Sequence, residues 1–179
     1  MQQTKHALVA LVTDKPGVLN RIASLFRRRG FNIESIAVGH SEMPNVSRVT
    51  IVVDSTTAQV EQVRKQLEKE VDVIKVTDVT GEGTIIRELA LVKVKTNMDN
   101  RSEIMQIVDI FRAKIVDVSA DSVTVEVTGD DEKIGSLYKL LSAFGIKEIA
   151  RTGTIAMTRG NAGSAEEGKQ SKKRAEKQP

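Results

Sequence analysis

One order of strands and helices occurs twice along this chain, and the repetition restricts its fold more than any other feature. In each copy, apolar runs of strand length alternate with segments whose apolar residues recur at helical spacing. The first copy predicts the order strand, helix, strand, strand, helix, strand over residues 6–13, 18–29, 31–38, 46–54, 56–68 and 71–79. The second copy predicts the same order over residues 88–96, 100–112, 114–119, 122–128, 131–144 and 146–157.

Local signals mark several of the expected helix ends. Gly30 follows three arginines and suits the left-handed position that ends a helix. The segment Thr56-Thr57-Ala58-Gln59 has the capping-box pattern that opens a helix. In the second copy we expect Asn100 and Asp131 to cap the two helices. The end signals and the periodicity therefore predict the same order of elements, βαββαβ.

This order is that of the ferredoxin-like unit, so we predict an α+β fold made of two such units in succession. Two helices on one face leave the other face of each sheet open, and dimerisation through sheets or edge strands would cover apolar surface. We expect the first unit in residues 1–80, a linker in 81–86 and the second unit in 87–159. Residues 160–179 lack apolar periodicity, which predicts a disordered tail.

The composition offers few groups that could perform catalysis. Cysteine is absent, which excludes disulfides, thiolate metal sites and a cysteine nucleophile. The two histidines, His6 and His40, lie at a strand start and near a hairpin end, where sheet or surface roles account for them. The acidic run Asp130-Asp131-Glu132 opens a predicted helix, where acids complement the helix dipole, so we predict no metal site. We therefore expect a chain without catalytic residues of its own.

The charge and hydropathy patterns favour neither a nucleic-acid nor a membrane partner. The formal net charge is only +3, and much of the excess lies in the tail, at Lys169, Lys172, Lys173, Arg174 and Lys177. The strands beginning at Ala7 and Val46 carry no aromatic side chains that could stack on RNA bases. No apolar run approaches the roughly 20 residues of a membrane helix, and the first residues show no signal peptide. We expect a cytoplasmic protein.

The candidate site is the loop between the first strand and the first helix, Asp14-Lys15-Pro16-Gly17-Val18-Leu19. Backbone N–H groups at the helix start have no helical acceptor, so those of Gly17, Val18 and Leu19 can hold a carboxylate. Gly17 permits close approach of a ligand, Pro16 stiffens the loop, and Asp14 can accept hydrogen bonds from an ammonium group. A zwitterionic amino acid needs both kinds of group. A capped helix start with a tight turn explains the same residues equally well.

A second segment, Gly30-Phe31-Asn32-Ile33-Glu34-Ser35, places a side chain with both a donor and an acceptor among apolar neighbours. In a dimer, Asn32 could reach a ligand bound at the loop of the neighbouring chain.

Residues 14–19 and 29–36, with the arginine-rich helix end, resemble an ACT domain, and more narrowly the small regulatory subunit of acetolactate (acetohydroxyacid) synthase. Further similar segments extend the resemblance from residue 6 to about 158: 47–51, 71–76, 87–94 and 110–118.

The resemblance implies a homodimer formed through the first units, which are ACT domains, with a branched-chain amino acid, commonly valine, bound between them. It places the effector on Asp14, Lys15, Pro16, Gly17, Val18 and Leu19, with Asn32 and Ile33 in the facing segment. Relatives often carry Asn where this chain has Asp14, a charge that favours an ammonium group and repels a carboxylate.

The resemblance also implies a partner, the large catalytic subunit, which the small subunit activates and makes sensitive to feedback inhibition. Thiamine diphosphate, magnesium and FAD would belong to that partner, and this chain would hold no cofactor. The alternative is a free-standing ACT-domain sensor that regulates another protein; pull-down of a large subunit would separate the two functions.

Overall fold

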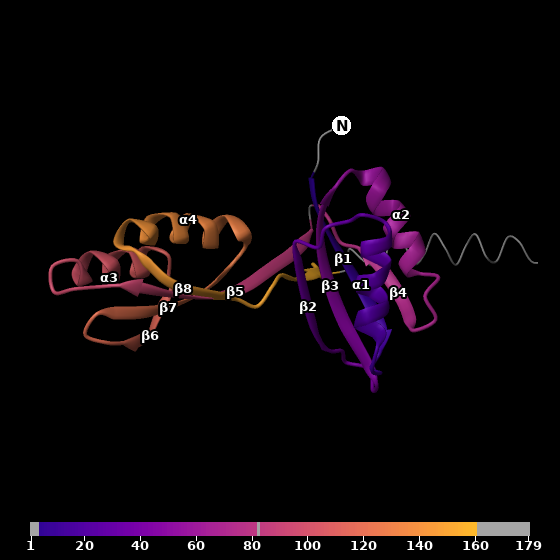
Figure 1. Ribbon diagram of the computed structural model, residues 1–179, viewed down its shortest axis with the longest axis horizontal. Coiled ribbons are helices and arrows are strands. Elements are labelled where there is room, and N and C mark those ends of the chain that lie inside the picture. The colour runs from indigo at the N-terminus through magenta and orange to yellow at the C-terminus, as the bar shows by residue number, and fades with distance from the viewer. Residues whose placement is uncertain (1–3, 82, 161–179) are drawn as a thin grey trace, which may run out of the picture. The chain divides into compact units, whose positions relative to one another are not determined.

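The computed structural model describes residues 4–81 and 83–160 of the 179-residue chain. These residues form two compact units (Figure 1). One unit comprises Ile86–Ile155. The other comprises the residues up to Ile85 together with the segment that starts at Ala156. In each unit an antiparallel sheet carries two helices on one face.

The first unit follows the predicted order βαββαβ. Its elements are β1 (Thr4–Thr13), α1 (Val18–Arg28), β2 (Ser35–His40), β3 (Val46–Ser55), α2 (Thr57–Leu67) and β4 (Val73–Asp78). All neighbouring strands are antiparallel, in the sheet order β2-β3-β1-β4. Side chains on one face of the sheet pack against both helices, and the largest fully buried side chain of this core is Phe26 of α1, which meets Phe31 edge-on at a ring-centroid distance of 6.5 Å.

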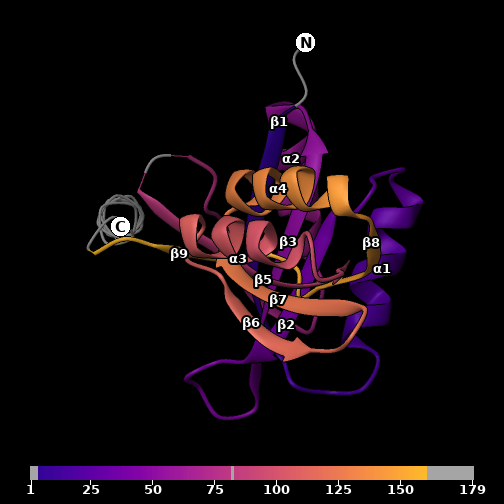
Figure 2. The same cartoon turned by 90° about the vertical axis from the view of Figure 1, so that its left-hand side faces the viewer.

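The second unit repeats this arrangement with aliphatic side chains. Its elements are β5 (Thr84–Lys95), α3 (Arg101–Ile110), β6 (Lys114–Val118), β7 (Ser122–Gly129), α4 (Asp131–Leu141), a 3-10 turn (Ser142–Phe144) and β8 (Ile146–Arg151). The first two residues of β5 belong to the other unit, as do all but the first residue of the last strand, β9 (Ile155–Thr158). The sheet order is β6-β7-β5-β8, and β9 also pairs with β5. Helices α3 and α4 lie side by side over this sheet (Figure 2). The predicted α+β class, with two ferredoxin-like units, is confirmed.

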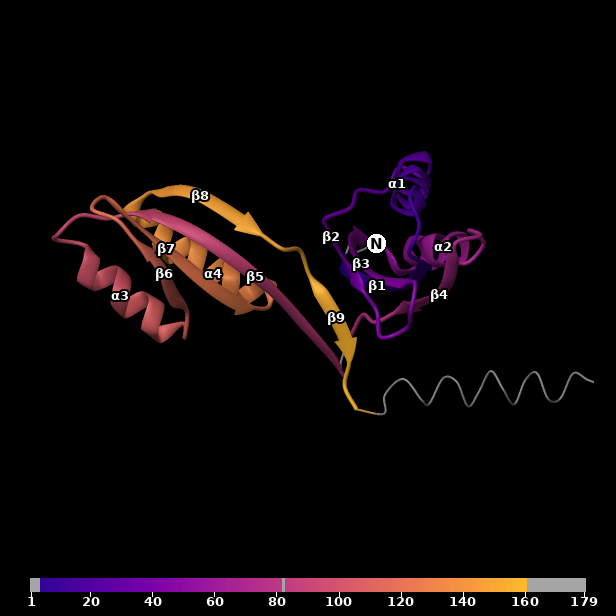
Figure 3. The ribbon, with the colours of Figure 1, turned by 90° about the horizontal axis from the view of Figure 1, so that it is seen from below.

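The boundaries of several elements differ from those predicted. Strand β5 begins at Thr84, inside the segment predicted as the linker 81–86. The single strand predicted over 146–157 is divided into β8 and β9 (Figure 3), because Gly153 turns the chain with φ 83°. The segment from Ala156 on, predicted within a second unit of 87–159, packs in the first unit, where Arg48 Nη2 donates to the Ala156 carbonyl at 2.7 Å. The predicted disordered tail lies, from residue 161 on, outside the described residues.

The centre of the first sheet is buried on both faces. Ala7 and Val9 of β1 stand opposite Val52 and Thr50 of β3, on the face away from the helices, and all four residues are buried. Arg48, which bonds Ala156, belongs to the same face because it is two residues from Thr50. The prediction that this face of the first sheet stands open is therefore wrong. Its edge strands β2 and β4 remain as surfaces that a second chain could pair with.

Helix ends follow the predicted signals in the first unit. Gly30 adopts φ 70°, its N–H donates to the Arg27 carbonyl, and Phe31 N–H donates to the Phe26 carbonyl at 3.0 Å. This turn uses the residues that the alternation assigned to a strand, so β2 begins at Ser35 rather than at Phe31. At the start of α2, Gln59 Oε1 accepts from the Thr56 N–H at 3.2 Å, as the capping-box pattern predicts.

The predicted caps of the second unit need correction. Asn100 does not cap α3 with its side chain; its Oδ1 accepts from Thr96 Oγ1 at 3.0 Å and from the Asn97 N–H at 2.8 Å, which fastens the loop before the helix. Asp130, not Asp131, caps α4, and its Oδ1 accepts from the Lys133 N–H at 2.9 Å. An acidic run permits either register from sequence, and the backbone conformation selects the first residue of the run.

A pH-dependent ion pair lies on the outer face of α2. Arg64 Nε and Nη2 donate to the Glu61 carboxylate at 2.8 and 2.7 Å. The hydrogen bonds from Arg64, with the positive charges of Arg64 and Lys65, lower the pKa of Glu61 from 4.5 to about 2. Because the folded pKa lies below the unfolded one, this stabilisation is present at neutral pH and is lost as the pH falls from about 4.5 towards 2.

Glu61→Gln should therefore lower the free energy of unfolding at pH 7 and have no effect near pH 2. The expected loss is at most about 1 kcal/mol, because the Glu61 side chain is 45% exposed and solvent screens the pair. Urea unfolding at both pH values measures it, with Glu42→Gln, an exposed carboxylate in the β2–β3 turn, as the control. An equal loss at pH 7 and pH 2 would contradict the assignment.

Candidate functional site

The loop from Asp14 to Gly17 connects the central strand β1 to α1, and all four residues are exposed. Gly17 is the N-cap of α1 and adopts a left-handed conformation, φ 87° and ψ −10°. A side chain at this position would be strained by the backbone, although an added Cβ would meet no atom within 4 Å. The conformation of the loop thus favours glycine here, and open space lies in front of it.

The loop presents backbone donors without acceptors. Among the described residues, no acceptor lies opposite the N–H groups of Gly17 and Leu19, and Val18 N–H reaches the Lys15 carbonyl only at 3.5 Å. The positive end of the helix dipole adds to the potential of these amides. The helix start therefore presents a group of backbone N–H donors that can bind an anionic oxygen, and they belong to the predicted site residues Gly17, Val18 and Leu19.

Asp14 supplies a carboxylate at the entrance of the same loop. Its backbone N–H donates to the Asn45 carbonyl at 2.9 Å, which ties the loop to the turn between β2 and β3. Its Oδ2 lies 3.4 Å from Nδ1 of His40, at the end of β2. Both side chains are exposed, so the carboxylate remains accessible to a cationic group from solvent.

The facing segment lies at the other end of α1. Asn32 is exposed and its Nδ2 donates to Glu34 Oε1 at 3.1 Å, while Ile33 packs partly against the core. Helix α1 has 11 residues, which span about 16 Å, and it separates this segment from the loop. One chain therefore does not bring Asn32 and Ile33 together with residues 14–19. A site that contains both segments needs two chains.

Two residues that the sequence analysis did not place at the site, Asp72 and Arg21, lie beside the loop. Asp72, in the turn before β4, accepts the Thr13 N–H with its backbone oxygen at 2.9 Å and the Thr13 hydroxyl with Oδ1 at 3.1 Å. Its Oδ2 pairs with Nη1 of Arg21 in α1. These residues are separated by up to 59 positions in the chain, and no local pattern in the sequence connects them.

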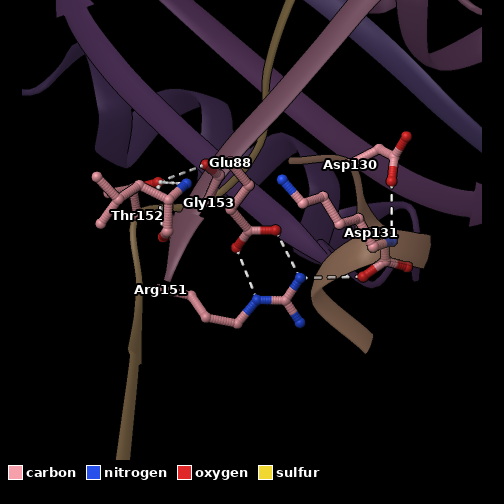
Figure 4. Close-up of polar contacts among 8 residues, drawn as sticks. Glu88, Asp130, Asp131, Arg151, Thr152 and Gly153 are labelled. Carbon is pink, nitrogen blue, oxygen red and sulfur yellow. Dashed lines mark hydrogen bonds and ion pairs between the residues drawn. The ribbon is translucent and has the colours of Figure 1, made fainter. Parts of the chain in front are cut away.

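A polar network in the second unit links two strands to the start of a helix. Arg151 of β8 donates through Nε and Nη2 to the buried Glu88 of β5 at 2.8 and 2.5 Å, and through Nη2 to Asp131 of α4 at 3.0 Å (Figure 4). Hydrogen bonding to Glu88 raises the pKa of Arg151 above its ordinary value. The three charged groups satisfy one another, and the bidentate pair links two strands to a helix start.

Among the described residues, no other feature forms a candidate site as well defined as the loop between β1 and α1. No group of three or more His, Asp or Glu side chains there is arranged to hold a metal ion. None of the helices in the described part of the chain is long and apolar enough to span a membrane. A shallow groove of about 460 Å³ beside α2 contains no predicted site residue; it is lined by Arg29, Phe31, Gln62, Val63, Lys65, Gln66, Glu68 and Lys69.

Comparison with known proteins matches both units to the family that the sequence motifs resemble. The family model "AHAS small subunit-like ACT domain" matches residues 8–75, and the model "Small subunit of acetolactate synthase" matches residues 87–160. A probable acetolactate synthase small subunit of Methanothermobacter thermautotrophicus is 54% identical over 90% of this chain and 96% of its own length. The acetolactate synthase small subunit of Bacillus subtilis is 52% identical over 87% of this chain and 91% of its own length.

A solved structure agrees with the sequence relatives. The crystal structure of the acetolactate synthase small subunit from Thermotoga maritima matches with a TM-score of 0.82 and 45% identity, over 89% of this chain and 99% of that one. The resemblance noted from the loop and strand motifs is thereby confirmed. The chain belongs to the family of acetolactate synthase small subunits.

Proposed function

We propose that this chain activates the large catalytic subunit of acetolactate synthase and makes the holoenzyme sensitive to feedback inhibition by a branched-chain amino acid. Of the three such amino acids, valine is the effector we expect. The observation that carries the proposal is the loop, in which the unpaired amides of Gly17 and Leu19 lie close in the chain to the exposed carboxylate of Asp14. The large subunit is proposed as the partner because the chain belongs to the small-subunit family. Thiamine diphosphate, magnesium and FAD belong to that partner in this proposal, and the chain contributes no catalytic residue.

The loop is suited to a zwitterion with an apolar side chain. The amides and the helix start receive the carboxylate, and Asp14 accepts hydrogen bonds from the ammonium group. Leu19 is 45% exposed on the first turn of α1 and offers apolar surface to an aliphatic side chain. Asn32 and Ile33 of a second chain would complete the site, because the first chain holds its own copies at the far end of α1.

The β2 edge is the surface that best supports a homodimer of the first units. β2 pairs with β3 without a register shift, and its Ile36 and Val38 are exposed although they stand opposite Ile51 and Val49 on the helix side of the sheet. The other edge strand, β4, carries Lys75 and an irregular register against β1, two features that oppose pairing with another strand. Effector bound where two chains meet would stiffen that interface and shift the holoenzyme between states, and a coupling of about 1–3 kcal/mol suffices for feedback control.

Calorimetric titration of the full chain with valine, leucine and isoleucine tests the proposal, together with turnover of the reconstituted holoenzyme. We expect valine to bind, the chain to raise the turnover of the large subunit, and valine to reduce it again; the chain alone should show no turnover. Absence of binding by all three amino acids would contradict the effector site. Binding without any effect on a large subunit would favour the free-standing sensor.

A further inference from the structure

Asp72 contacts both ends of the loop that carries the free amides. At the entrance it holds Thr13, the last residue of β1, through the two hydrogen bonds described above. At the exit its Oδ2 pairs with Arg21, one turn into α1. A single carboxylate therefore spans the loop between its two flanking elements.

Apart from Asp72, the loop is tied to the rest of the unit by the Asp14 N–H, which donates to the Asn45 carbonyl at 2.9 Å. Within it, Lys15 N–H donates to the Thr13 carbonyl at 3.0 Å, and the contact from Val18 N–H to Lys15 is longer. Asp72 itself is firmly placed, because its side chain is only 15% exposed and the next residue, Val73, pairs with Val12 of β1. Asp72 is thus a firmly held group that contacts both ends of the loop, and it belongs to neither β1 nor α1.

We infer that Asp72 is a positioning residue for the effector: it holds the Gly17 and Leu19 amides in the arrangement that a carboxylate requires. This inference rests on the proposed function of the loop. Binding geometry on a loop depends on the groups that fix its ends, since a small displacement of donors weakens every hydrogen bond to the ligand. The turn between α2 and β4 is thereby part of the effector site without touching the ligand.

The negative charge of Asp72 and its hydrogen bonds have opposite expected effects on the binding of an anionic ligand. A carboxylate near a helix start repels an anionic ligand, whereas its hydrogen bonds hold the donors in place. Asp72→Asn removes the charge and the ion pair with Arg21. If the charge were the dominant effect, this variant would bind valine more tightly; if the position is dominant, it binds less tightly.

We expect Asp72→Asn and Thr13→Val each to weaken the binding of valine to the full chain about three- to tenfold, the range of one or two lost hydrogen bonds. The concentration of chain that half-activates the large subunit should not change. Thr13→Ser keeps the hydroxyl and should retain the original affinity. Glu70→Gln is the matched control, because Glu70 lies in the same turn but its carboxylate is 3.9 Å from Arg28, at the other end of α1.

Titration calorimetry and valine inhibition of the reconstituted holoenzyme give the two readouts. Unchanged or tighter binding by Asp72→Asn and Thr13→Val overturns the inference while the proposed function stands. A loss of equal size in Glu70→Gln or Thr13→Ser also overturns it, since the effect would then be general destabilisation of the turn. If the unsubstituted chain binds none of the three branched-chain amino acids, the proposed function fails and the inference fails with it.

Discussion

Gly17→Asp is expected to abolish inhibition by valine while activation of the catalytic subunit survives. The new side chain would place bulk and a negative charge at the N-cap of α1, where the carboxylate of the effector is proposed to lie. It would also repel the carboxylate of valine. The fold tolerates the change, because a Cβ meets no atom within 4 Å and the left-handed conformation costs roughly 1–2 kcal/mol, less for Asp than for bulkier residues.

Gly83→Asp is the matched control for this prediction. Gly83 has φ +90° and Gly17 has φ +87°, and neither has an atom within 4 Å of an added Cβ. The two variants therefore carry the same new charge and similar backbone strain. Turnover of the reconstituted holoenzyme against valine concentration, with and without each variant, measures the difference. Inhibition that persists in Gly17→Asp would show that the loop does not receive the effector.

Val38→Lys is expected to separate the proposed dimer into monomers and to remove valine binding at the same time. Val38 is 47% exposed on the edge strand β2, where a lysine opposes pairing with another strand. Effector binding is lost with the dimer because the loop and the segment containing Asn32 and Ile33 lie at opposite ends of α1 in one chain. Analytical ultracentrifugation and calorimetry on the same sample measure both consequences.

Ile74→Lys is the control for the edge. Ile74 is 54% exposed on β4, the opposite edge of the same sheet, so the two variants exchange similar side chains for the same charge. The control should remain dimeric and bind valine. Dimer loss in Ile74→Lys but not in Val38→Lys would assign the interface to β4, and a Val38→Lys monomer that still binds valine would show that one chain contains the whole site.

Most of the architecture could be predicted because it is encoded locally. Alternation such as that of Val123, Val125 and Val127 identifies a half-buried strand without knowledge of its neighbours, and helical spacing such as that of Ile134, Leu137 and Leu141 does the same for a helix. Gly30 ended α1 as predicted for the same reason. The helix start with its free amides at Gly17 and Leu19 was also predicted from sequence, since both are properties of a short segment; the effector site on residues 14–19 stays a prediction.

Errors arose where two local descriptions compete. Phe31 fits a strand by alternation, but its N–H completes the turn after α1 and its ring packs on Phe26, so β2 starts later. The apolar pattern of 146–157 is continuous across Gly153, whose positive φ divides it into two strands. In both cases the backbone conformation of a turn decided the boundary, and hydrophobic periodicity carries no information about it.

The two βαββαβ units and the donor-rich loop follow from local patterns, because those features depend on residues close together in the chain. The way in which the loop is held does not follow from such patterns. The contacts of Asp72 with Thr13 and Arg21, and of Arg48 with Ala156, join residues between 51 and 108 positions apart. Such contacts depend on sheet register and helix packing, which place side chains in space only after the whole unit has folded.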